Sequence, residues 1–282
     1  MVSQVSLELQ DAVAVVTFHN PPDGYMDGQT EIEFEKALDE IEENESIRVA
    51  VLTGGQEDVF IRHYDVNVLN ERSKSMVAKG MAFDPSRSVP EALLHKCFRR
   101  MESMPKPFVA AINGSAMGGG FELALACDIR LVKNGPYDLG LPEINIGLLP
   151  GAGGTQRLTR LVGEAKALEL MLLGRTISPQ EATNLGLASF CVDGDVAQKA
   201  MEIAKTLASR SLRATKHIKD LIYGVHHRTV EDGFARERTL FCDLMVDEFS
   251  AEEMQKMADG ERDIRDPDFM ADPLQKRTTM DD

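Results

Sequence analysis

The sequence predicts an α/β fold in which strand–strand–helix turns make up the first 195 residues and helices follow them. Short apolar runs of strand length alternate with amphipathic helical patterns, from Val5–Leu9 and Val13–Phe18 at the start to Ser189–Val192. From about Asp195 onward, strand patterns are almost absent. Because crossover connections within one sheet are right-handed, this alternation indicates right-handed ββα turns.

The elements predicted between these limits follow one another along the chain. Turn residues at Asn20–Gly24 end the first strand pair. Residues 66–104 are polar and rich in methionine, with a helical pattern near Ala92–Met101, and we interpret them as an insertion over a pocket. The other predicted elements are a helix over Thr30–Glu43, strands over Val49–Gly54 and Phe108–Asn113, a helix over Gly119–Cys127, a strand over Asp128–Val132, and helices over Thr155–Val162 and Ala165–Leu173.

The chain therefore divides into three predicted parts. Residues 1–195 form the α/β core, in which an active site is expected. Residues 196–265 form a helical region, broken near Gly224 and Gly233, whose apolar faces predict oligomerisation. Residues 266–282 are a polar tail that contains two prolines, so an extended or poorly ordered segment is expected there.

Composition indicates a globular protein and excludes several classes. Of 282 residues, 43% are apolar and 27% charged, which is typical of a soluble domain. The net charge of −15 argues against general nucleic-acid binding, which depends on neutralising phosphates. No apolar run reaches the roughly 18 residues that a membrane span needs, and the N-terminus lacks a secretory signal. Four widely spaced cysteines without metal-ligand spacing fit a reduced, cytoplasmic protein with no metal site.

A glycine-rich turn carries the clearest chemical signal. In Ala110–Asp128 (AAINGSAMGGGFELALACD), a strand ends, three consecutive glycines follow, and a helix begins. Free N–H groups and the positive end of a helix dipole at such a turn stabilise a developing negative charge. The alternative interpretation of an isolated glycine triplet is a tight strand-to-helix turn with no chemical role.

The wider sequence resembles the crotonase (enoyl-CoA hydratase/isomerase) superfamily, and most closely its enoyl-CoA hydratases. The resemblance rests on Ala110–Asp128, on Gly140–Leu158 (GLPEINIGLLPGAGGTQRL), and on Leu172–Ala182 followed by Gly186–Ala188. Pattern, order and spacing agree from about residue 47 to 192. The resemblance implies a crotonase (ClpP-like) spiral of ββα turns with a C-terminal helical trimerisation region. It also implies an acyl-CoA substrate and trimers, often paired into hexamers.

Four site residues carry over from the family motifs. The resemblance makes the backbone N–H groups of Tyr64 and Gly119 the oxyanion hole for the thioester. It makes Glu143 the acid that delivers a proton to C2 and Glu122 the base that activates water. Two carboxylates in one desolvated site cannot both ionise easily, so their protonation states separate into acid and base roles. A solvated helix face is the alternative for either glutamate taken alone.

Two departures from the family pattern concern the loops around the predicted hole. His63 and Tyr64 stand where the family usually has glycine and a small residue. The early loop, which includes Tyr25 and Met26, also differs from the family's CoA-contacting loop. We expect His63, Asp65, Tyr25, Met26 and Gly118 near the pocket or the CoA.

The predicted function is enoyl-CoA hydratase with no cofactor, coenzyme A being part of the substrate. The alternatives are an enoyl-CoA isomerase, or a hydrolase of cyclic diketones that needs no CoA and uses active-site histidines. A non-catalytic relative that binds RNA is a third alternative, against which the net charge and the glutamate pair argue. The glycines at 151–154 superficially resemble a dinucleotide loop, but no acidic partner follows, so no NAD site is predicted. Arg157 and Arg160 are expected to be structural.

Overall fold

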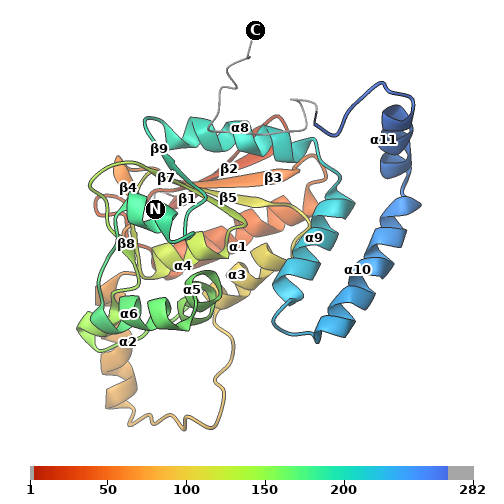
Figure 1. The fold of residues 1–282 in the computed structure, drawn as a ribbon. Coiled ribbons are helices and arrows are strands. Elements are labelled where there is room, and N and C mark those ends of the chain that lie inside the picture. Colours follow the sequence, from red (N-terminus) through yellow and green to blue (C-terminus); the bar gives the residue numbers. More distant parts are fainter. Residues whose placement is uncertain (1–2, 266–282) are drawn as a thin grey trace.

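The computed structural model describes residues 3–265, and its main feature is a six-stranded sheet (Figure 1). Strands β1 and β2 pair antiparallel, and every other neighbouring pair in this sheet is parallel. The central strands are buried on both faces, as parallel sheets covered by helices require. In order across the sheet the strands are β1 (Val5–Gln10), β2 (Val13–Phe18), β3 (Val49–Gly54), β5 (Phe108–Ile112), β7 (Ile129–Lys133) and β9 (Phe190–Val192).

A second sheet of three short parallel strands lies nearer the predicted site. It consists of β4 (Asp58–Ile61), β6 (Gly114–Met117) and β8 (Leu139–Gly140), in that order. Strand β6 leads directly into the glycine turn, and β8 precedes the segment of Glu143. This sheet therefore fixes the relative positions of the two segments that the sequence singles out.

Helices cover both faces of the large sheet (Figure 1). On one face, α1 (Gly28–Glu43), α3 (Leu93–Ser103) and α4 (Gly119–Ala126) bury side chains such as Phe34, Phe98 and Phe121. On the other face, α8 (Val196–Ala208) packs through Ala200 and Ile203. The remaining helices are α2 (Val66–Ala78), the 3₁₀ turn η1 (Glu143–Ile146), α5 (Gly154–Val162), α6 (Glu164–Leu173), α7 (Pro179–Asn184), α9 (Leu212–Gly224), α10 (Val230–Met245) and α11 (Glu248–Ala258).

The predicted α/β class and the order of its main elements are confirmed. The predicted helix break near Gly224 is confirmed, because α9 ends at Gly224 and α10 begins at Val230. The predicted break near Gly233 is wrong, because Gly233 lies inside α10. The segment 66–104 contains helix α2 in addition to the expected helical pattern, which is α3. The predicted tail, residues 266–282, lies outside the described residues.

The last helices extend away from the sheets (Figure 1). Helices α9, α10 and α11 expose large apolar side chains, including Ile222 (65% exposed), Phe234 (58%) and Phe241 (62%). Of the helices in the described part of the chain, none is long and apolar enough to cross a membrane.

Candidate active site

The glycine turn between β6 and α4 leaves one backbone donor free. Gly118 has φ +50°, a left-handed conformation that favours glycine, and it donates its N–H to the Gly140 carbonyl at 2.9 Å. Helix α4 then begins at Gly119, where intrahelical bonding leaves the N–H without a partner. Among the described residues, none accepts a hydrogen bond from the Gly119 N–H.

A second free donor approaches from the loop after β4. Met26 donates its N–H to the His63 carbonyl at 2.9 Å, and Asp65 donates to the Met26 carbonyl at 2.8 Å. The intervening N–H of Tyr64 has no acceptor within residues 3–265. A methyl group built on Gly119 would lie 3.9 Å from the Tyr64 nitrogen, so the two donors are neighbours. This arrangement can hold an oxyanion.

Glu122, one turn into α4, is 2% exposed and firmly held. Its Oε1 accepts hydrogen bonds from the N–H groups of Ala152 and Gly154, both at 2.7 Å. Burial raises the pKa of Glu122, and these two bonds act in the opposite direction because they stabilise the ionised form. Because both donors bind Oε1, the other carboxylate oxygen of Glu122 is available to accept a proton as a general base.

Glu143 begins η1 and has a different environment. Its Oε2 is buried, with no hydrogen-bond partner among the described residues. Burial raises the pKa of Glu143 to about 7, its own backbone N–H lowers the value, and the charge of Glu122 raises it further. Glu143 is therefore the member of the pair that more readily keeps a proton at neutral pH, which suits an acid.

The raised pKa of Glu143 predicts a pH-dependent effect of Glu143→Gln on stability. Between pH 4.5 and about 7, the folded protein keeps a proton on the Glu143 carboxyl group. The unfolded chain, in which this carboxyl has its ordinary pKa of 4.5, has released that proton. Stability contributed by this proton is present below pH 4.5 and is lost as pH rises through about 7. At pH 8 the neutral amide should therefore stabilise the fold by about 1–2 kcal/mol, after allowance for partial exposure of the carboxyl group. Thermal unfolding at pH 5 and pH 8 measures this effect. An equal change in Tm at both pH values would contradict it.

These groups share one cavity of about 610 Å³. Its lining contains six of the residues singled out from the sequence, namely His63, Tyr64, Gly118, Gly119, Glu122 and Glu143. A methyl group on Gly118 would lie 3.2 Å from Glu143 Oε1, so the acid lies directly against the glycine turn. In the described part of the chain, no three His, Cys, Asp or Glu side chains are grouped to hold a metal ion.

Three other predicted residues support the cavity without lining it. The ring of Tyr25 packs against the ring of His63, with centroids 4.5 Å apart and the ring planes tilted by 34°. Asp65 caps α2 by accepting a hydrogen bond from the Asn67 N–H at 2.8 Å. Met26 is buried beside Gly119, where its sulfur would lie 2.9 Å from a methyl group on that glycine.

The bulky side chains at positions 63 and 64 hold the loop in place. The Tyr64 hydroxyl donates to Glu31 Oε1 at 2.7 Å and accepts from Arg72 at 3.1 Å. Burial, followed by Glu31, raises the pKa of Tyr64, so the hydroxyl stays protonated. His63 Nδ1 lies 2.7 Å from the Tyr64 carbonyl; since a carbonyl only accepts, Nδ1 carries the proton. The Tyr64 side chain thus anchors the loop, and the backbone nitrogen of Tyr64 lies beside Gly119.

Sequence reasoning missed two features of the site. The amide donors that hold Glu122 come from residues 152 and 154, for which no side-chain pattern exists. His95 of α3 also lines the cavity, and its Nδ1 is buried without a partner in the described residues. In the sequence, His95 stands next to Leu94 and three positions before Phe98, both of which α3 buries. This position in the helical pattern is the one signal that could have placed His95 near the cavity.

Arg157 has the structural role expected of it. Its guanidinium donates two hydrogen bonds to the Glu102 carboxylate, at 2.7 and 2.9 Å, and a third to the Ala152 carbonyl at 2.8 Å. It thereby holds α5 against α3 behind Glu122.

The fold and cavity define an α/β enzyme site in which two carboxylates face a pair of free backbone donors. Comparison with known proteins identifies the family: the sequence profile described as "Enoyl-CoA hydratase/isomerase" matches residues 8–270. The chain belongs to this family and is an enzyme of the crotonase superfamily.

Similar proteins carry corresponding names. The chain is 34% identical to a probable enoyl-CoA hydratase of Bacillus subtilis, covering 89% of this chain and 94% of that one. It is 35% identical to the short-chain-enoyl-CoA hydratase of Clostridium acetobutylicum, covering 78% and 81%. The crystal structure of an enoyl-CoA hydratase from Bacillus anthracis superposes with a TM-score of 0.80 at 30% identity, covering 91% and 96%.

Proposed function

We propose that the protein hydrates 2-enoyl-CoA thioesters, adding water across the C2=C3 bond. The observation that carries this proposal is the pairing of Glu122 and Glu143 in one cavity beside the free N–H groups of Tyr64 and Gly119. The relatives named as enoyl-CoA hydratases support it.

Each group then has a defined task in the reaction. The thioester oxygen accepts hydrogen bonds from the two N–H groups, which stabilise the enolate that forms when water adds to C3. Ionised Glu122 takes one proton from the water molecule while the oxygen of that water bonds to C3. Protonated Glu143 gives its proton to C2, so the product gains one H and one OH. Transfer of a proton from Glu122 to Glu143 restores both residues.

A turnover screen tests this proposal against its rivals. We expect loss of the enoyl absorbance of crotonyl-CoA, and no reaction of cyclic 1,3-diketones in the absence of CoA. The hydrolase is the second candidate because His63 lines the cavity and packs against Tyr25. Diketone cleavage without crotonyl-CoA hydration would establish the hydrolase instead, and conversion of 3-enoyl-CoA to 2-enoyl-CoA alone would establish an isomerase.

We also propose a homotrimer, or a hexamer of two trimers, as the working assembly. The supporting observation is the set of apolar side chains on α9, α10 and α11 that are exposed in the single chain. Contact of such a surface with water is unfavourable, and large exposed apolar patches mark interaction sites. Mass measurement at micromolar concentration should give a multiple of three subunits of 31.1 kDa. Phe241→Asp should shift the population toward smaller species, whereas the exposed Lys205→Gln on α8 should not. A wild-type mass near one subunit would contradict the proposal.

A further inference from the structure

A second cavity of about 630 Å³ lies behind the candidate active site, between α3, α5, α9 and the start of α10. The two cavities share His95, which lines both. They also meet along the chain, where Ala152 lines the first and Gly153 lines the second. Because the N–H groups on either side of Gly153 hold Glu122, this junction lies immediately behind the carboxylate.

The second cavity is strongly basic in a chain whose net charge is −15. Seven lysines and arginines line it, against three carboxylates. Glu91 and Glu102 are each paired with an arginine, and Asp220 is shared between Arg228 at 2.8 Å and Arg236 at 2.9 Å. The lining therefore attracts anions although the molecule as a whole repels them.

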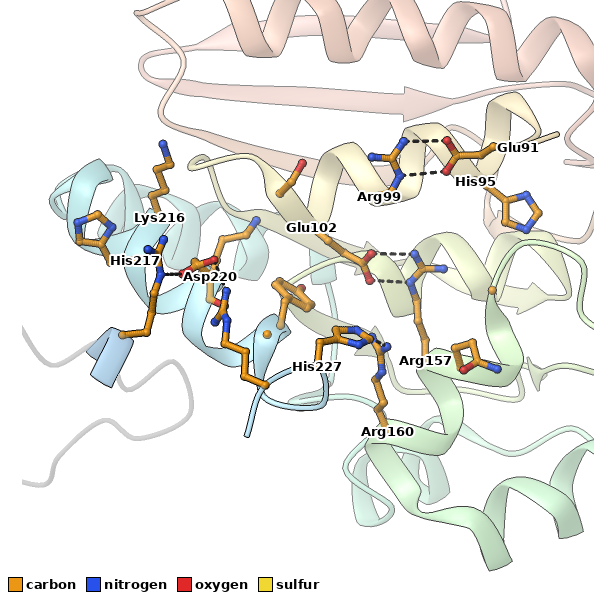
Figure 2. Close-up of a pocket in the computed structure, with 18 residues that line it drawn as sticks. Glu91, His95, Arg99, Glu102, Arg157, Arg160, Lys216, His217, Asp220 and His227 are labelled. Carbon is orange, nitrogen blue, oxygen red and sulfur yellow. Dashed lines mark hydrogen bonds and ion pairs between the residues drawn. The ribbon is translucent and has the colours of Figure 1, made fainter. Parts of the chain in front are cut away.

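Two of these cations are not neutralised. Arg160 donates to His227 Nε2 at 3.2 Å, and neither Arg160 nor Lys216 has a carboxylate partner within residues 3–265. Figure 2 shows His95 at one end of the cavity and Lys216 at the other, with the Glu102–Arg157 pair between them. At the junction, the buried Nδ1 of His95 lacks a partner in the described residues, and a polar ligand atom would satisfy it.

The residues that the two cavities share suggest a path for an acyl chain, given the proposed function on which this inference rests. With the thioester oxygen at Tyr64 and Gly119 and with C2 and C3 at the two glutamates, the distal carbons continue past Glu122 toward His95 and Gly153. We propose that the second cavity receives this distal end and that the preferred substrates are 2-enoyl-CoAs carrying a carboxylate there. An uncharged chain end would gain nothing from the basic lining, whereas a carboxylate would pair with an unneutralised cation, Arg160 or, for a chain that reaches the far end of the cavity, Lys216.

Matched substrate pairs test this inference. In chains of six to twelve carbons, the ω-carboxy 2-enoyl-CoA and the 2-enoyl-CoA with a terminal methyl group differ only at the distal end. At the length that spans the junction, kcat/KM should favour the carboxylate by about tenfold, the effect of one charge-assisted hydrogen bond. Arg160→Gln should reduce this ratio severalfold, and Lys216→Gln should do so for chains long enough to reach the far end of the cavity. Lys205→Gln, an exposed lysine of α8 outside the cavity, should leave it unchanged.

An equilibrium measurement separates failure of this inference from failure of the proposed function. Calorimetric titration with decanedioyl-CoA and decanoyl-CoA needs no turnover, and the dicarboxylic thioester should bind about tenfold more tightly to the wild type. Equal or weaker binding of decanedioyl-CoA, together with equal kcat/KM at every length, would overturn the inference even if crotonyl-CoA is hydrated. A preference that survives in both Lys216→Gln and Arg160→Gln would also overturn it. Absence of any hydration would refute the proposed function, and the binding ratio would still decide this inference.

Discussion

Replacing Glu143 with glutamine should lower kcat for 2-enoyl-CoA hydration by at least about 10²-fold, the usual loss when a general acid or base is removed. The amide keeps the size of the side chain but cannot release a proton to C2. Glu122→Gln should have a similar effect, because an amide cannot take a proton from water. KM should change little in both variants, since neither carboxylate is assigned to CoA binding. Steady-state kinetics with crotonyl-CoA measures both parameters.

A matched control makes this result specific. Glu8→Gln removes one negative charge from an exposed side chain of β1 and should leave kcat within about twofold of the wild type, as expected for a surface substitution. Glu143→Gln with a near wild-type kcat would refute the acid assignment. A loss confined to KM would refute it as well, because it would indicate a binding role.

The second large effect concerns the oxyanion hole. Gly119→Pro removes the backbone donor at the first position of α4, where proline is otherwise well tolerated. Loss of one such donor should cost about 10²- to 10³-fold in kcat. Circular dichroism and solution mass should match the wild type, so that the loss reflects the missing N–H group.

Gly119→Ala is the matched variant for this experiment because it retains the N–H. Its methyl group would lie 2.9 Å from the sulfur of Met26, the end of a flexible side chain that can move. We expect kcat within about tenfold of the wild type, well above that of the proline variant. If both variants were equally impaired, the effect would be steric, and the assignment of the Gly119 N–H would fail.

The sequence predicted the large sheet well because its strands are apolar runs bounded by turns. Strands β4, β6 and β8 were not predicted, and for β6 and β8 the reason is physical. Strand β6 reads Gly-Ser-Ala-Met, with no β-branched residue, and β8 has two residues, so pairing with neighbours rather than intrinsic preference makes them strands. The break expected at Gly233 failed because the side chain of Thr229 caps α10 by accepting from the Asp232 N–H. One glycine after that cap does not prevent a helix from forming.

For the site, the sequence indicated which groups face the cavity but not what holds them. The two glutamates and the two N–H groups belong to recognisable motifs that a single cavity brings together. The Tyr64–Glu31 hydrogen bond joins residues 33 positions apart, and the amides that hold Glu122 are 30 and 32 positions from it. Such contacts depend on the tertiary fold, since local patterns describe only neighbouring positions. The basic cavity is likewise assembled from four helices, none of which is unusual alone.

Product analysis in deuterium oxide tests the central claim most directly. If Glu143 delivers a solvent-derived proton to C2 while water adds at C3, crotonyl-CoA should give 3-hydroxybutyryl-CoA with one deuterium at C2. Proton NMR and mass spectrometry of the product detect both changes. Recovery of unhydrated crotonyl-CoA, or of free coenzyme A from cleavage of the thioester, would contradict the account.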